Sequence, residues 1–74
     1  MNFTAQFTKI DSGYMGQLAE WPEVVTEGSS LEDCRLQLKD AMEQMILAHK
    51  QLGIEIPKNK VVFEKISLEP ENVS

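Results

Sequence analysis

The sequence predicts an α+β domain in which one long helix packs on one face of a small sheet. Three features predict this fold: residues 3–26 hold short alternating stretches, residues 30–53 have the marks of a helix, and residues 61–68 alternate again. The expected order is three antiparallel strands, a helix and a fourth strand (βββαβ). With 74 residues, the chain is long enough for a single domain spanning 1–74.

The first strand is expected over residues 3–10, where apolar and polar side chains alternate. Residues 11–13, Asp-Ser-Gly, have the composition of a turn, and residues 14–20 return as a second strand. The Trp-Pro pair that follows interrupts strand pairing, because proline has no N–H to donate. A short third strand is then expected over residues 24–26.

The register of the first two strands depends on the length of their turn. A turn of two or four residues pairs the face of Phe7 with Gly16 and Leu18. A turn of three residues pairs that face with Met15 and Trp21 instead. The sequence leaves both registers open.

The helix is expected from Ser30 to Gly53, because both ends carry capping residues. The Ser30 hydroxyl can accept a hydrogen bond from the first turn, and Asp33 can reach back to the Ser30 N–H. At the other end Gly53 suits a left-handed cap, with Lys50 near the last carbonyls. Pro57 prevents the helix from resuming.

One stripe of this helix is apolar and is expected to face the sheet. Large residues recur every seven positions, with small ones between them: Leu31, Leu38, Met45 and Leu52, with Cys34, Ala41 and Ala48. Because Cys34 is the only cysteine, the chain can form no internal disulfide, and a reducing compartment is expected. Burial would also leave its thiol unreactive.

Two leucines lie nearly opposite that stripe. Leu36 and Leu47 are three helical turns apart and share one line on the helix, separated by about 16 Å, with Ile46 expected to lean the same way. This alignment favours a partner that covers the outer side of the helix.

Composition narrows the kinds of partner. The chain has 12 acidic and 7 basic residues and a net charge of -5, which argues against direct binding to nucleic acid or to an anionic membrane surface. No stretch has the features of a signal peptide or a membrane span, so a soluble, cytoplasmic protein is expected. An acidic domain this small suits a basic protein partner.

No pattern for catalysis is present, and no metal or cofactor is expected. The acids near the predicted sheet lie in turns, at strand ends or in the last strand: Asp11, Glu20, Glu27 and Glu64. A metal-dependent nuclease would need several carboxylates that converge on one site. His49 has no second histidine or cysteine at ligand spacing, so a packed histidine is expected.

Four short motifs resemble the HicB-like antitoxin family over residues 2–68. They are Asp-Ser-Gly-Tyr at 11–14, Trp-Pro-Glu-Val-Val-Thr-Glu-Gly at 21–28, Ser-Leu-Glu-Asp-Cys at 30–34 and Gly-Ile-Glu-Ile-Pro at 53–57. The resemblance implies a partial ribonuclease H-like fold. It also implies an antitoxin that binds and inhibits a HicA-like toxin, a small basic protein that cleaves mRNA with a histidine.

The chain departs from the family's pattern in two places. Trp21-Pro22-Glu23 stands where relatives more often have Leu-Pro-Gly. Many relatives also continue into a DNA-binding domain, whereas this chain is expected to have no C-terminal DNA-binding domain, because six residues follow the last expected strand. Operator binding is therefore not expected, and the acidic charge balance agrees.

The residues expected to contact a partner fall into two groups. One is at the end of the predicted sheet and the other on the outer helix face: Glu20, Trp21 and Glu23, and Leu36, Glu43 and Leu47. Trp21 fits either of two roles, an interface anchor or a plain core residue.

A second hypothesis is an orphan module with no cognate toxin, which forms homodimers or higher homo-oligomers. Its contacts would be the outer sheet face and the ridge of Leu36 and Leu47, paired across a two-fold axis.

Overall fold

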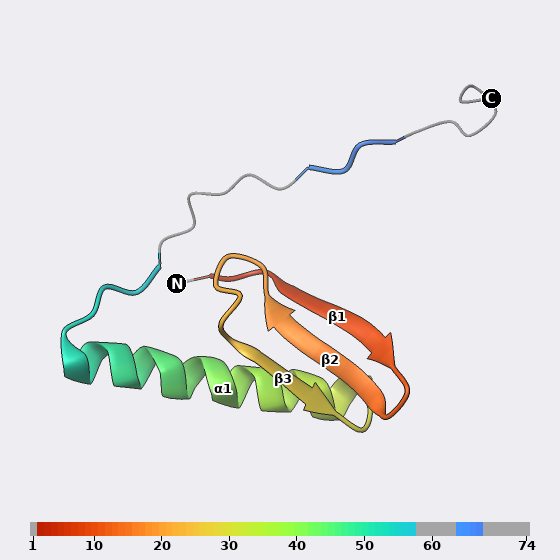
Figure 1. Ribbon diagram of the computed structural model, residues 1–74, viewed down its shortest axis with the longest axis horizontal. Helices are drawn as coiled ribbons and strands as arrows, with labels where there is room; N and C mark the ends of the chain where they lie inside the picture. The colour runs from red at the N-terminus through yellow and green to blue at the C-terminus, as the bar shows by residue number, and fades with distance from the viewer. Residues whose placement is uncertain (1, 58–63, 68–74) are drawn as a thin grey trace.

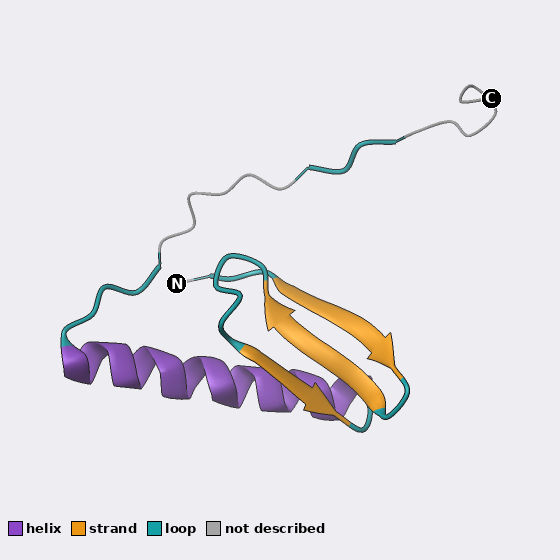
Figure 2. Ribbon diagram, viewed as in Figure 1, coloured by secondary structure: helices purple, strands orange, loops and turns teal. Residues whose placement is uncertain are grey.

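Three antiparallel strands and one long helix follow one another along the chain (Figure 1). The structure is a computed structural model that describes residues 2–57 and 64–67. The elements are β1 (Ala5–Ile10), β2 (Gly13–Leu18), β3 (Val25–Gly28) and α1 (Leu31–Leu52). The strands form one sheet in the order β1-β2-β3, and α1 packs against it along β2 and β3 (Figure 2). The predicted α+β class, with a helix on a sheet, is confirmed.

The fourth strand was expected over residues 61–68, and half of that range cannot be compared with the prediction. Residues 61–63 and 68 lie outside the described residues. Residues 64–67 are described, and they are exposed and belong to no strand of the sheet.

A two-residue turn, Asp11-Ser12, sets the register of the first two strands. Ile10 lies opposite Gly13, and Phe7 therefore lies opposite Gly16. This is the pairing expected for a turn with an even number of residues. Gly13 has a φ of 145°, and a Cβ there would overlap the carbonyl oxygen of Gly28, so this corner of the sheet requires glycine.

The predicted ends of β2 and β3 need correction. Strand β2 ends at Leu18 and not at residue 20, and β3 runs from Val25 to Gly28 and not over 24–26. The reason is a tight turn between the two strands, in which the Val24 N–H donates to the Trp21 carbonyl at 3.0 Å. The turn directs the Trp21 and Val24 side chains into the core, and both are 2% exposed.

The helix begins and ends where the sequence predicted, but one capping contact differs. The Ser30 hydroxyl accepts from the Asp33 N–H at 3.0 Å. The Asp33 carboxylate accepts from the Ser29 N–H at 2.9 Å and not from Ser30 as expected. The carboxylate therefore reaches one residue further back than in a regular capping box. Gly53 ends the helix in the left-handed conformation, with a φ of 72°.

The buried face of α1 is shorter than the predicted stripe. Cys34 and Leu38 are buried, but Leu31 is 38% exposed, Leu52 is 72% exposed and Ala48 is exposed. The helix is about 33 Å long and the six-residue strands only about 20 Å, and the C-terminal end of the helix extends past the sheet (Figure 1). Ile46 also differs from the prediction, because it packs against the core and not toward Leu47.

The core lies between α1 and the ends of β2 and β3. Its buried members are Leu18, Trp21, Val24 and Leu38. Partly buried residues from both termini of this unit and from the helix surround them: Phe3, Phe7, Ala41, Met42, Met45, Ile46 and Ile56. In the part of the chain that the structure describes, no helix has the length and apolar character needed to cross a membrane.

Candidate functional site

The outer face of α1 gathers three of the residues expected to contact a partner. Leu36 is 63% exposed and Leu47 is 52% exposed, and Glu43 lies exposed between them on the same side of the helix. Asp40, also exposed, occupies the turn between Leu36 and Glu43. We call Leu36, Asp40, Glu43 and Leu47 the outer face. It is an apolar ridge interrupted by carboxylates.

The other three expected residues do not join this surface. Trp21 is 2% exposed and lies in the core, which is one of the two roles that the sequence left open. Its ring is 5.9 Å from the Phe3 ring and 4.9 Å from the His49 ring, measured between centroids. Glu23 is exposed and lies at the rim of a groove beside β3. A partner that contacts the outer face would not reach these residues on the same surface.

Glu20 binds within the chain. Its two carboxylate oxygens accept from the Thr4 N–H and the Thr4 hydroxyl, both at 2.6 Å. The hydroxyl bond and then the backbone bond from Thr4 hold the pKa of the Glu20 carboxyl below its ordinary value of 4.5. Glu20 thus ties the residue before β1 to the residues after β2, and its negative charge strengthens both bonds.

The Glu20 contact predicts a dependence of stability on pH. Since folding lowers the pKa of Glu20, its contribution is present at neutral pH and is lost as the pH falls below 4.5 through the folded-state pKa. We expect Glu20→Gln to be less stable than the wild type at pH 7, and the difference to shrink in acid. Urea unfolding of both proteins between pH 7 and pH 3 measures this, and a difference that does not change with pH would contradict it.

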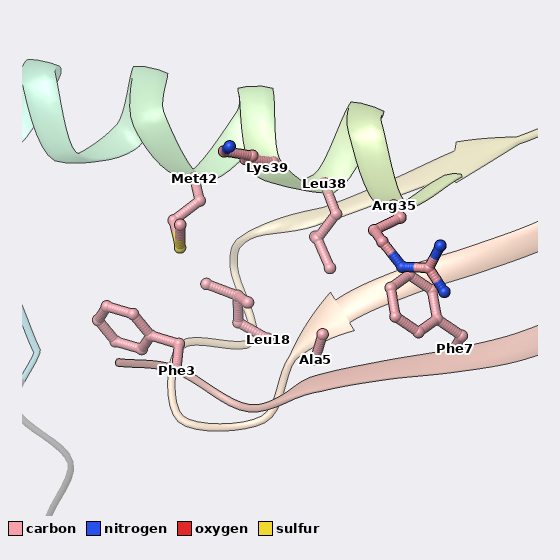
Figure 3. Close-up of a pocket in the computed structure, with 8 residues that line it drawn as sticks. All are labelled: Phe3, Ala5, Phe7, Leu18, Arg35, Leu38, Lys39 and Met42. Carbon is pink, nitrogen blue, oxygen red and sulfur yellow. The ribbon is translucent and has the colours of Figure 1, made fainter. Parts of the chain in front are cut away.

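A second surface lies between β1 and the helix (Figure 3). It is a groove of about 250 Å³ whose floor is apolar and whose helix side carries two cations. The residues around it are Phe3, Ala5, Phe7, Leu18, Arg35, Leu38, Lys39 and Met42. The Arg35 guanidinium lies 5.9 Å from the centre of the Phe7 ring, within the range of a cation–π contact. We call this the β1 groove.

A signal for the β1 groove is present in the sequence, but the prediction did not use it. Arg35 and Lys39 are four residues apart, so they lie on one side of α1. The alternation of Phe3, Ala5 and Phe7 already placed an apolar row on one face of β1. What the sequence could not show is that α1 lies along β2 and β3 and leaves this row partly uncovered.

The contacts of His49 and Cys34 are those of residues that pack within the fold. The Nδ1 of His49 is 3.0 Å from the Met45 carbonyl oxygen, and its ring meets the Trp21 ring edge to face. Burial raises the pKa of the Cys34 thiol, and the Asp33 and Glu27 carboxylates raise it further. A thiol in this setting stays protonated and unreactive at neutral pH.

Metal ligands do not gather among the described residues, where no group of three His, Cys, Asp or Glu side chains could hold an ion. The acids considered from the sequence are dispersed: Asp11 in the first turn, Glu20 bound to Thr4, Glu27 in β3 and Glu64 beyond the helix.

Comparison with protein families shows which part of the chain resembles a known family. The model of a family described as UPF0150-like matches residues 3–57. This range contains the whole sheet and the whole helix. No curated protein and no solved structure gave a significant match.

Proposed function

The chain belongs to the UPF0150-like family, whose match covers the sheet and the helix together, and we propose that it acts by binding a protein through this unit. The proposed role is an antitoxin that binds and inhibits a small basic, RNA-cleaving toxin of the HicA kind. The observation that carries the proposal is the outer face of α1, where Leu36 and Leu47 are exposed beside the Asp40 and Glu43 carboxylates. The resemblance of the sequence motifs to HicB-like antitoxins supports it.

The charge pattern of the outer face suits a basic partner. Asp40 and Glu43 lie between the two leucines, so a partner that buries the leucines must also place its own groups against both carboxylates. Lysine or arginine side chains satisfy that requirement, and opposite charges across an interface speed encounter and exclude wrong partners. The net charge of -5 also attracts a basic partner, over a longer distance.

The β1 groove is less suitable for such a partner. Its helix side carries Arg35 and Lys39, which would repel a basic protein. The outer face of the sheet is a weaker candidate, because its β1 side chains, Gln6 and Thr8, are polar and Met15, opposite Thr8, is only partly exposed. The outer face of α1 is therefore the surface that combines exposed apolar area with negative charge.

Inhibition would need no chemistry from this chain. A toxin of this kind cleaves RNA with a histidine, and a protein bound over that histidine excludes the RNA substrate. The leucines would supply the buried contacts at the centre of the interface, where most of the binding energy resides. The carboxylates would occupy the region of the toxin that otherwise attracts RNA phosphates.

Co-expression tests this function directly. The chain is expressed with a short basic protein encoded beside it, and growth and co-purification are measured. We expect the wild type to restore growth and co-purify. A double variant, Leu36→Lys with Leu47→Lys, should lose both properties, because it places two cations against a basic partner and removes the apolar anchors. We expect its affinity for the toxin to fall by more than about a hundredfold.

The matched control adds the same two charges elsewhere. Gln6→Lys with Thr8→Lys changes two exposed residues of β1 and leaves α1 intact. This control should restore growth as the wild type does. If both double variants restore growth, or if the wild type neither restores growth nor co-purifies, the proposal is wrong and the orphan homo-oligomeric module is the better account.

A further inference from the structure

A third surface of the molecule lies along the opposite side of α1 from the β1 groove. It is an open groove of about 500 Å³ between the helix and β3, which is an edge strand of the described sheet. Glu23, Val24, Val25, Ala41, Gln44, Met45 and Ala48 line it. Val25 is 46% exposed and Ala48 is also exposed. We propose that this groove is the contact surface between two copies of the chain.

The helix side of the groove has the spacing of a helix–helix contact. Ala41, Gln44 and Ala48 line the groove, and Gln37 and Gln51 continue the same row along the helix, so the five residues are separated by four, three, four and three positions. This is the spacing of the two core positions in a pair of packed helices, and it keeps all five residues on one side of α1. We call these five residues the glutamine–alanine flank.

The glutamine–alanine flank carries no charge, although the helix around it is highly charged. The charged residues Lys39, Asp40, Glu43 and Lys50 all fall between its first and last members, and none belongs to it. Only Glu23, at the rim, brings a charged side chain to the groove from the strand side. The glutamine amides can both donate and accept, so two such flanks can hydrogen-bond with each other.

A second copy is the occupant that this chemistry favours. In a two-fold dimer each copy offers the same surface, so a charged patch meets its own like charge. The outer face would set Asp40 and Glu43 against carboxylates, and the β1 groove would set Arg35 and Lys39 against cations. The groove along β3 avoids this repulsion on its helix side. Of the three surfaces it is the one best able to bind a copy of itself.

The arrangement of the elements fits such a dimer. A two-fold axis perpendicular to the sheet would reverse the direction of α1, so the two helices would lie antiparallel on the same side of the paired sheets. Ala41 and Ala48 have small side chains at the contact, which allows the helices to approach closely. β3 lies beside α1 at this edge (Figure 1), and the edge of β3 that no described strand pairs with would face the second copy. Both outer faces would remain accessible.

Two neighbouring residues on different sides of α1 give a matched test. Ala48→Glu and Leu47→Glu each place one carboxylate at an exposed position of the same helical turn. Sedimentation equilibrium over a range of concentrations is measured for the wild type and both variants, with circular dichroism to check that each is folded. We expect a wild-type dimer, the same dimer for Leu47→Glu, and dimerisation at least about tenfold weaker for Ala48→Glu.

Gln51→Glu provides a second variant in the same flank, also at an exposed position, and should weaken the dimer in the same direction. A wild type that stays monomeric at every concentration would overturn the inference. It would be overturned equally by a dimer that Leu47→Glu disrupts and that Ala48→Glu and Gln51→Glu leave intact. The test requires no toxin, so its result is independent of the proposed function.

Discussion

Replacing Trp21 with alanine is expected to remove a large part of the free energy of unfolding. The Trp21 ring is 2% exposed and fills the space between Phe3, His49 and the helix. Truncating a buried tryptophan to alanine costs about 3–5 kcal/mol, through lost burial and the cavity left behind. A domain of this length has a total stability of roughly 4–11 kcal/mol, so the loss is a large part of it.

Urea unfolding followed by far-UV circular dichroism measures this effect. Trp21→Phe is the matched control, because it keeps an aromatic ring in the same space and should cost less than the alanine variant. An alanine variant as stable as the wild type would show that the side chain is not part of the core. For this reason Trp21→Ala is unsuitable for testing a partner interface, since loss of binding would follow from loss of folding.

Gly28→Ala is expected to cause the second large loss of stability, because it would separate β3 from the helix. A Cβ at Gly28 would overlap the backbone nitrogen and Cα of Cys34, at the start of α1. Backbone atoms of a capped helix cannot move aside individually, so the helix would have to shift as a whole. Overpacking of this kind costs about 1–3 kcal/mol, and a shift of the helix would add to it.

Gly16 gives a comparison in which the obstructing atoms can move. A Cβ there would lie 3.0 Å from the Cys34 Sγ and 3.1 Å from the Phe7 Cε1, both side-chain atoms. We expect Gly16→Ala to be milder than Gly28→Ala, and Cys34→Ala to relieve Gly16→Ala but not Gly28→Ala. Thermal unfolding of the single and double variants measures these differences. Equal relief of both glycine variants by Cys34→Ala would contradict the account.

Local signals predicted the helix well. Ser30 and Gly53 act through atoms within a few residues of themselves, so their capping roles could be inferred without knowledge of the rest of the fold. The hydrogen bond to the Asp33 carboxylate was predicted from the Ser30 N–H, but it comes from the Ser29 N–H. Ser29 and Ser30 both offer an N–H to this carboxylate, and the path of the chain into the helix decides between them.

Predictions that depend on how the elements meet were less successful. Leu31 and Leu52 fit the seven-residue pattern, but the pattern contains no information on where the sheet ends. Leu52 lies on the part of the helix that extends past the sheet, and Leu31, at the first helical position, is also exposed. Trp21 could be assigned to the core or to an interface, because the deciding contacts come from Phe3 and His49, distant in sequence. The register of β1 and β2 depended only on whether the turn between them has an even or an odd number of residues, and the turn has two.

The same difference, between what one element determines and what contacts between elements determine, applies to the candidate surfaces. Leu36, Glu43 and Leu47 lie on one element, so helical periodicity alone was enough to bring them together. Glu20 and Glu23 lie near the turn between β2 and β3, where the sequence could not show that Glu20 binds Thr4 or that Glu23 borders a groove.

The most direct test of the central claim, that the outer face of α1 binds a basic protein partner, is an NMR titration. The ¹⁵N-labelled chain is titrated with a catalytically inactive form of the basic toxin, and shifts of the backbone amides are followed. The account predicts that the largest changes occur along the outer side of α1, around Leu36, Asp40, Glu43 and Leu47. Changes concentrated instead around Phe7, Arg35 and Lys39, or no changes at all, would contradict it.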